Sequence, residues 1–235
     1  MPVLEKVISR VIAIDGPSGS GKSTIAKEIA KELGVLYIDT GSMFRALAAV
    51  AFDLNIELVE GPKLKAFLDS LKIEYGISDS LLIRINGQDL TDKIREHHVS
   101  ELASVISQLP SVRKYLLDFQ RSLARNQICV MEGRDIGTVV FPDSFCKFFI
   151  TATAEIRAQR RLNQLRESGD QTITFSKIIE DVLKRDETDT LRVLAPLKKA
   201  EDAILLDTSL LTMAEVLNIL AKEIKFRAEL FGFKL

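Results

Sequence analysis

The chain has 235 residues, of which 46% are hydrophobic, and 32 Lys and Arg side chains nearly balance 33 Asp and Glu side chains. This length and apolar content suit one α/β domain with an insertion, and the near-zero net charge argues against nucleic-acid binding. The first ten residues hold Glu5, Lys6 and Arg10, and no apolar stretch approaches the roughly 20 residues that span a bilayer, so we expect a cytoplasmic protein without membrane association.

Five short apolar runs are predicted to form the strands of an open parallel sheet. They are continuous in hydrophobicity rather than alternating, which is typical of strands covered on both faces. In chain order they are Val11–Ile14, Val35–Ile38, Ile128–Met131, Phe148–Ile150 and Ala203–Leu206. Helical patterns fall between them, so the sequence predicts an α/β fold with helices flanking the sheet.

Two of the predicted helices have clear boundary signals. Apolar residues recur every four positions from Ile25 to Leu33, and Gly34 then ends the helix. Near the C-terminus, Thr212-Met-Ala-Glu215 has the form of a capping box and opens a helix that runs toward Phe226. We expect the aromatic residues in the C-terminal tail to pack on the body of the protein.

Residues 62–100 interrupt the alternation of strands and helices. An amphipathic segment from Leu64 to Leu71 is followed by Lys72–Ser78 and Leu81–Ile85, and then by Asn86-Gly87. Asn-Gly is a strong turn signal and predicts a hairpin. We interpret this stretch as an insertion that forms a lobe over the site; the alternative is a surface hairpin without a functional role.

The segment after the first predicted strand carries the clearest functional signal. It contains the Walker A pattern, Gly16-x4-Gly21-Lys22-Ser23, between an apolar strand and an amphipathic helix. Glycines let backbone N–H groups approach an anion, Lys22 would reach the β and γ phosphates, and the Ser23 hydroxyl would bind Mg²⁺ together with phosphates and water. The predicted ATP site comprises Gly16, Pro17, Ser18, Gly19, Ser20, Gly21, Lys22, Ser23 and Thr24.

Arginines cluster at the predicted ends of other strands and helices. Arg45 follows the second strand, Gly133-Arg134-Asp135 follows the third, and Arg157, Arg160 and Arg161 lie on the helix after the fourth. A triphosphate facing a monophosphate concentrates negative charge that guanidinium groups neutralise. Since the chain has no Asn-Lys-x-Asp motif for reading a guanine base, the pattern favours a small-molecule kinase.

Cys129 and Cys146 lie in apolar runs and form no CxxC pair, and the two histidines are adjacent. A zinc site of Cys and His ligands cannot be assembled from this set. We therefore expect two buried thiols in a reducing compartment.

Four segments resemble those of the bacterial cytidylate kinases, the CMP kinases of the nucleoside monophosphate kinase group. They occur in order through nearly the whole chain: Ile14-Asp-Gly-Pro-Ser-Gly-Ser-Gly-Lys-Ser23, Asp39-Thr-Gly-Ser-Met-Phe-Arg45, Gly133-Arg-Asp-Ile-Gly-Thr-Val-Val-Phe-Pro-Asp143, and Arg185-Asp-Glu-Thr-Asp-Thr-Leu-Arg192 leading into Ala195-Pro196. The resemblance implies that ATP phosphorylates CMP, and dCMP as a second acceptor, with Mg²⁺ as cofactor. We expect a monomer.

The resemblance further implies a P-loop NTPase-type architecture within a single domain, 1–235. A CORE with a five-stranded parallel sheet would carry an NMP-binding insert at about 62–100 and a short LID at about 155–190.

It also implies roles for individual residues. The acceptor phosphate would be held by Arg45, Arg134 and Arg192, the cytosine surrounded by Thr40, Ser104, Arg113 and Asp135, and the ribose placed near Arg185 and Asp189. The catalytic residues would be Lys22, Arg134, Arg157, Arg161 and Arg192, of which Arg157 and Arg161 would act on the donor triphosphate as the LID closes.

Three positions depart from the usual family pattern: Thr40, Phe44 and Glu132 stand where Ser, Tyr and Asp are common. Thr40 keeps the hydroxyl and Glu132 keeps the charge on a longer arm, whereas Phe44 loses a hydroxyl.

Two alternatives stay open. One is another P-loop small-molecule kinase that acts on a hydroxyl group, AMP or UMP; a hydroxyl acceptor would favour a carboxylate base near the third strand, a role for which Asp135 could be mistaken. The other is a nucleotide-binding regulator without transfer activity, which would bind nucleotide and form no CDP.

Overall fold

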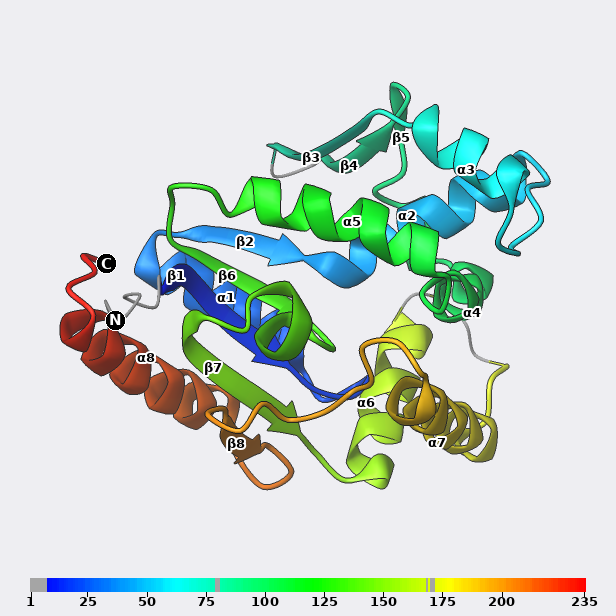
Figure 1. The fold of residues 1–235 in the computed structure, drawn as a ribbon. Helices are drawn as coiled ribbons and strands as arrows, with labels where there is room; N and C mark the ends of the chain where they lie inside the picture. The colour runs from blue at the N-terminus through cyan, green and yellow to red at the C-terminus, as the bar shows by residue number, and fades with distance from the viewer. Residues whose placement is uncertain (1–7, 79–80, 168, 170–171) are drawn as a thin grey trace. The chain divides into compact units, whose positions relative to one another are not determined.

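The computed structural model describes residues 8–78, 81–167, 169 and 172–235 (Figure 1). The chain divides into two compact units: the residues up to Tyr37 together with Ala124–Leu235 form the first unit, and Ile38–Leu123 form the second. Several predicted segments extend outside the described residues, namely the N-terminal positions 1–7, positions 79–80 of the expected insert, and positions 168 and 170–171 of the expected LID.

A five-stranded sheet has the order β2-β6-β1-β7-β8, and all of its residues except the last two of β2 belong to the first unit. The strands are β1 (Ser9–Asp15), β2 (Leu36–Asp39), β6 (Cys129–Gly133), β7 (Ser144–Thr151) and β8 (Ile204–Asp207). β1 pairs in parallel with both β6 and β7, and β7 pairs in parallel with β8. The predicted strands are therefore confirmed, although β7 begins at Ser144, four residues before the predicted start.

Burial differs between the centre and the edge of this sheet. Most of β1 and β7 and all of β6 are buried, as expected for strands covered on both faces. β8 is an edge strand, and its Leu205 is 58% exposed. The prediction that every strand is covered on both faces is wrong there, because the hydrophobic run of an edge strand reads the same in sequence as that of a central one.

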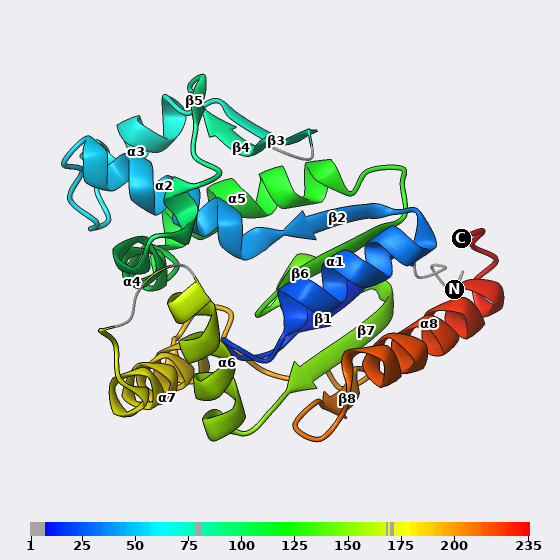
Figure 2. The same cartoon turned by 180° about the vertical axis from the view of Figure 1, so that it is seen from behind.

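Two helices cover one face of the sheet, α1 (Lys22–Leu33) and α8 (Met213–Leu230), as Figure 2 shows. Ile25 of α1 and Leu220 of α8 belong to the same buried core as Phe148 of β7. Gly34 ends α1 in the left-handed conformation, with a φ of 67°. Thr212 and Glu215 form the predicted capping box of α8, which continues to Leu230, past the expected end.

A second, smaller core joins α6 (Ala154–Glu167) and α7 (Phe175–Leu191), and β7 leads directly into α6 (Figure 1). This core consists of Ala158, Leu162, Ile178 and Val182. A π-helix, η2 (Ile136–Val140), follows β6. The segments after β1, β6 and β7 thus begin at the carboxyl ends of parallel strands, where open α/β sheets bind ligands.

The buried thiols and part of the aromatic tail agree with the sequence predictions. Cys129 and Cys146 are both buried, and burial raises the pKa of each thiol to about 12. The ring of Phe233 packs edge-on against Phe145, with their centroids 5.1 Å apart. Phe226, in contrast, is 62% exposed, so the packing prediction does not extend to it.

The second unit has its own three-stranded antiparallel sheet, in the order β3-β4-β5. Its elements are α2 (Thr40–Asp53), α3 (Pro62–Asp69), β3 (Ile73–Ser78), β4 (Leu81–Ile85), β5 (Gln88–Asp89), the 3-10 helix η1 (Lys93–Arg95), α4 (His97–Ile106) and α5 (Pro110–Leu123). Asn86 and Gly87 both have positive φ, 51° and 82°, as a two-residue hairpin turn requires. The predicted hairpin is confirmed between β4 and β5.

Within the described ranges, no helix combines the length and the hydrophobicity needed to cross a lipid bilayer.

Replacing Phe148 with Ala should lower the free energy of unfolding by about 3–5 kcal/mol, because the ring is 1% exposed and its removal leaves a cavity in the sheet core. Phe226→Ala is the matched control: the same atoms are removed from an exposed side chain, so the change should stay within about 0.5 kcal/mol. Urea denaturation followed by far-UV circular dichroism measures both. Equal losses in the two variants would contradict the core assignment.

Candidate active site

The phosphate loop occupies the turn from β1 to α1, and its glycines have the conformations that the motif predicts. Gly16, Gly19 and Gly21 have φ values of 150°, 76° and 90°. A Cβ on Gly16 would lie 1.9 Å from the carbonyl oxygen of Ile150 in β7, so no larger residue fits there. Gly21 is the N-cap of α1 and supplies no side-chain cap, so the first N–H groups of the helix suit an anion.

Two arginines of α6 hold the carbonyl groups of this loop. Arg157 Nη1 donates to the Ser18 carbonyl oxygen at 3.1 Å, and Arg160 Nη1 donates to the Ser20 carbonyl oxygen at 3.2 Å. In a planar trans peptide the C=O and the next N–H point in opposite directions. Because α6 binds the carbonyl groups, the N–H groups that follow them are directed away from α6.

The sequence analysis named Arg160 among the clustered arginines but gave it no role in the site. Its guanidinium also donates to the Thr208 carbonyl oxygen at 2.9 Å, just beyond β8. The only signal in the sequence was its place between Arg157 and Arg161, because contacts with backbone carbonyl groups leave no pattern in residue types.

Lys22 is buried at the base of the loop, and its Nζ donates to the Pro17 carbonyl oxygen at 2.8 Å. Burial, reinforced by the neighbouring Arg134 guanidinium, lowers the pKa of Lys22 to about 7, although the Glu132 and Asp15 carboxyl groups oppose the shift. A phosphate near this ammonium would favour its charged form. The predicted lysine is therefore in a position where an anionic ligand would stabilise it.

A cluster of arginines and aspartates gathers residues that are far apart in the sequence. Arg134 Nε lies 2.8 Å from Asp189 Oδ2. Arg192 lies 3.6 Å from Asp135 and 3.7 Å from Asp189, measured between nitrogen and carboxylate oxygen. Burial alone would raise the pKa of Asp189, but Arg134, with Arg185 and Arg192, holds it below its ordinary value. The structure thus brings together predicted site residues from two segments that are about 50 positions apart in the sequence.

The remaining predicted donor residues lie on α6. Arg157 forms a two-pronged ion pair with Asp186 of α7, with distances of 2.9 and 2.5 Å, and only 5% of the residue is exposed. Arg161 lies on the same helix and is half-buried. Arg157 is therefore engaged with both the loop and α7.

Two buried carboxyl groups flank the lysine. Glu132 of β6 accepts a hydrogen bond from the Tyr37 hydroxyl at 2.8 Å. Asp15, the last residue of β1, accepts the backbone N–H groups of Ile136 and Gly137, each at 2.8 Å. Burial raises the pKa of Asp15 to about 7, although the hydrogen bonds from these two backbone N–H groups oppose the rise. The sequence analysis assigned Asp15 no role; its signal was a charged residue at the end of an apolar run.

The other predicted acceptor residues belong to the second unit. Thr40 is the buried first residue of α2, and Arg45 Nη2 lies 2.8 Å from Asp39 Oδ2. Ser104 lies on α4. Arg113 of α5 lies over the ring of Phe44, with its Cζ 5.7 Å from the ring centroid, so the Phe at this position supplies a cation–π contact.

The residues present fit a magnesium ion carried by a nucleotide. Ser23 is exposed in the first turn of α1, immediately after Lys22, and Mg²⁺ prefers oxygen donors of this kind together with phosphates and water. In the part of the chain that the structure describes, no three His, Cys, Asp or Glu side chains form a group that could hold a metal.

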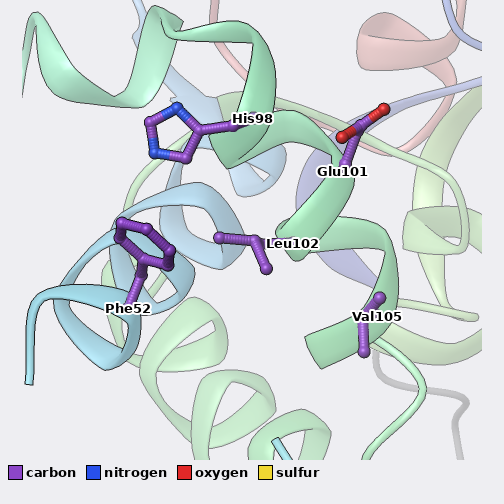
Figure 3. A pocket seen from close by; sticks show the side chains of 5 residues that line it. All are labelled: Phe52, His98, Glu101, Leu102 and Val105. Carbon is purple, nitrogen blue, oxygen red and sulfur yellow. The ribbon is translucent and has the colours of Figure 1, made fainter. Parts of the chain in front are cut away.

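A surface hollow of about 340 Å³ lies in the second unit, between the end of α2 and α4 (Figure 3). Its lining residues are Phe52, His98, Glu101, Leu102 and Val105. None of them is a predicted site residue, and the hollow does not coincide with the phosphate loop.

Comparison with known proteins places these residues in a family context. Residues 12–226 match the sequence model described as Cytidylate kinase. The cytidylate kinase of Caldicellulosiruptor saccharolyticus is 45% identical over 208 residues, covering 88% of this chain and 92% of that protein. The cytidylate kinase of Halalkalibacterium halodurans is 43% identical over 217 residues, covering 92% and 97%. A solved shikimate kinase from Acinetobacter baumannii aligns over 91% of this chain and 92% of its own, with 13% identity and a TM-score of 0.43.

Lys22→Met should stabilise the protein without nucleotide below about pH 7, because it removes a buried charge whose folded pKa lies below its unfolded value of about 10.4. Below the folded pKa both states are protonated and the full cost of burial is present. Between about pH 7 and 10 the unfolded chain binds more protons, so wild-type stability rises and the gap narrows. Thermal denaturation across this range should show a gap of a few degrees at about pH 6.

The control for this prediction is Lys147→Met. Lys147 is also buried, but its ammonium lies 2.8 Å from Asp202, so its loss removes an ion pair and should lower the melting temperature. A Lys22→Met variant that is less stable than wild type at every pH would contradict the assignment.

Proposed function

The chain belongs to the cytidylate kinase family, and from this membership we propose that it transfers the γ-phosphate of ATP to CMP, giving ADP and CDP, with dCMP as a second acceptor. The observation that carries the proposal is the group formed by the partly buried Arg134 and the buried Asp135, Asp189 and Arg192, in the same compact unit as the phosphate loop. Such a group offers two guanidiniums for an acceptor phosphate and carboxylates for a base and a ribose.

The chemistry of this reaction asks little of a general base. A phosphate oxygen of CMP is already a competent nucleophile, so the site has to align two anions and reduce their repulsion. In the proposed mechanism, Lys22 faces the transferring phosphoryl group, and Arg134 and Arg192 bind the acceptor phosphate and stabilise charge in the transition state. An acceptor phosphate would then compete with Asp189 and Asp135 for these guanidiniums.

A further set of residues reads the nucleoside in this proposal. Asp135 and the Ser104 hydroxyl accept hydrogen bonds from the 4-amino group of cytosine, and Arg113 donates a hydrogen bond to its N3 or O2. Thr40 lies beside the base. Arg185 and Asp189 bind the ribose, and Arg45 adds a third guanidinium at the acceptor phosphate. Arg113 is supported by its position over the Phe44 ring, which limits the orientations of its guanidinium.

Magnesium is proposed to enter with ATP and to be held by the Ser23 hydroxyl, phosphate oxygens and water. When bound, it supplies charge neutralisation at the β and γ phosphates. The residues of the chain contribute the rest: loop N–H groups of Gly16–Thr24 bind phosphate oxygens and Lys22 orients the transferring group.

We further propose that residues 62–100 form the NMP-binding insert of a single domain and that about 155–190 form a short LID. Closure of such parts would exclude water, which otherwise competes as acceptor. Arg157 and Arg161 would act on the donor triphosphate after closure. We also propose a cytoplasmic location. A monomer suffices for the proposed activity, because the phosphate loop and every proposed ligand come from one chain.

An ADP-release assay with different acceptors tests the function. CMP and dCMP should support turnover far above UMP, AMP or no acceptor, and Lys22→Met should lower kcat by roughly a hundredfold or more, because its charge is directed at the transferring group. ADP release that is the same with and without CMP would contradict the proposal. Nucleotide binding without CDP formation would instead identify a regulator.

Asp135→Asn should narrow the preference for CMP over UMP. A carboxylate accepts a hydrogen bond from the 4-amino group of cytosine, but in uracil it faces O4, which is also an acceptor. Sites that recognise polar atoms can discriminate between two such substrates by roughly 10⁴-fold. An amide can turn its NH₂ toward O4. The measurement is kcat/KM for both acceptors in both proteins. If Asp135 belongs to the magnesium shell instead, both values fall together and their ratio stays the same.

A further inference from the structure

Asp15 is a buried carboxylate that no step of the proposed reaction uses. Only 4% of the residue is exposed, and it ends β1 immediately before the phosphate loop. In the pairing of β1 with β6 it lies opposite Gly133, the residue before Arg134. It therefore stands between the segment that carries the donor site and the segment that carries two proposed acceptor ligands.

The Asp15 carboxylate caps the π-helix η2, although Asp15 lies on β1, far from η2 in the sequence. Its Oδ1 accepts the N–H of Ile136 and its Oδ2 accepts the N–H of Gly137, both at 2.8 Å. A helix is ordinarily capped by its own N-cap residue. Here the N-cap is Asp135, which makes no side-chain cap bond and lies 3.6 Å from Arg192. The two aspartates thus have different roles: Asp15 binds the backbone at the start of η2, and Asp135 lies near Arg192.

The surroundings leave little room for another arrangement. A Cβ on Gly137 would lie 3.4 Å from Asp15 Oδ2 and 3.1 Å from the Lys147 side chain. The raised pKa of Asp15 reflects the cost of burying a carboxylate there. An apolar residue at this position would avoid that cost but would leave two buried N–H groups without acceptors.

We infer that Asp15 is a positioning residue for the acceptor side of the site: its two bonds to the backbone of η2 hold the turn that presents Arg134 and Asp135. The phosphate loop has independent anchors, because Arg157 and Arg160 bind the carbonyl groups of Ser18 and Ser20. Loss of the Asp15 carboxylate should therefore weaken acceptor binding more than ATP binding. The inference rests on the proposed function for the identity of the acceptor.

Asp15→Asn tests the two hydrogen bonds from η2 to Asp15 with little change in the shape of the side chain. An amide has one acceptor oxygen, and its NH₂ group would face the second backbone N–H, so one of the two bonds is lost. Amide hydrogen exchange followed by NMR should show protection of Ile136 and Gly137 reduced by about tenfold or more, because hydrogen bonds to charged groups contribute at least that factor. Unchanged protection at both amides would overturn the inference.

Steady-state kinetics separate positioning from a merely structural role. In Asp15→Asn the KM for CMP should rise about tenfold or more, while the dissociation constant of a non-hydrolysable ATP analogue should stay within about threefold. Lys147→Met is the control, because the Lys147 side chain also lies beside Gly137 and its ammonium donates to the Pro142 carbonyl oxygen, so the variant alters the surroundings of η2 and keeps both Asp15 bonds. It should lower the melting temperature and leave the KM for CMP at the wild-type value.

Two results for Asp15→Asn would overturn the positioning role. One is a KM for CMP at the wild-type value, and the other is an equal rise in the KM for CMP and in the dissociation constant of the ATP analogue. A rise in the KM for CMP in Lys147→Met that matches the rise in Asp15→Asn would also do so, because it would trace the effect to general loosening. Exchange at Ile136 and Gly137 requires no turnover. Failure of the wild-type protein to form CDP would therefore count against the proposed function. The exchange measurement would still show whether Asp15 holds the two backbone N–H groups of η2.

Discussion

The site depends on positive charge that the fold buries. Lys22 is 4% exposed, and its pKa is lowered first by that burial and then by Arg134. The guanidiniums around it are held by internal carboxylates, as in the pairs of Arg157 with Asp186 and Arg134 with Asp189. Since isolated buried charges are costly, these aspartates stabilise the arginines that the fold buries.

The backbone of the phosphate loop depends in turn on the sheet. Gly16 passes so close to the Ile150 carbonyl of β7 that a side chain is excluded, and the carbonyl groups of Ser18 and Ser20 are bound from α6. β7 leads directly into α6, so one stretch of chain makes both sets of contacts with the loop (Figure 1). The N–H groups are oriented by these contacts as well as by the glycines.

The proposed acceptor ligands are divided between two compact units. Asp135 and Arg192 belong to the first, whereas Ser104 and Arg113 belong to the second. Within the first unit, Asp15 and the π-helix it caps define the position of the acceptor residues, which connects acceptor recognition to the same strand that begins the phosphate loop.

The sequence by itself determined the features that local spacing encodes: the phosphate loop, the capping box at Thr212, the end of α1 at Gly34 and the Asn86-Gly87 hairpin. These could be predicted because each depends on residues within a few positions of one another. Only the tertiary structure decided that Arg134 pairs with Asp189, 55 positions away, that Asp15 binds Ile136, 121 positions away, and that Arg160 binds Ser20, 140 positions away. Strand order sets these contacts, as it sets which strands are exposed at the edges, and no local pattern of residue types records the order in which parallel strands pair.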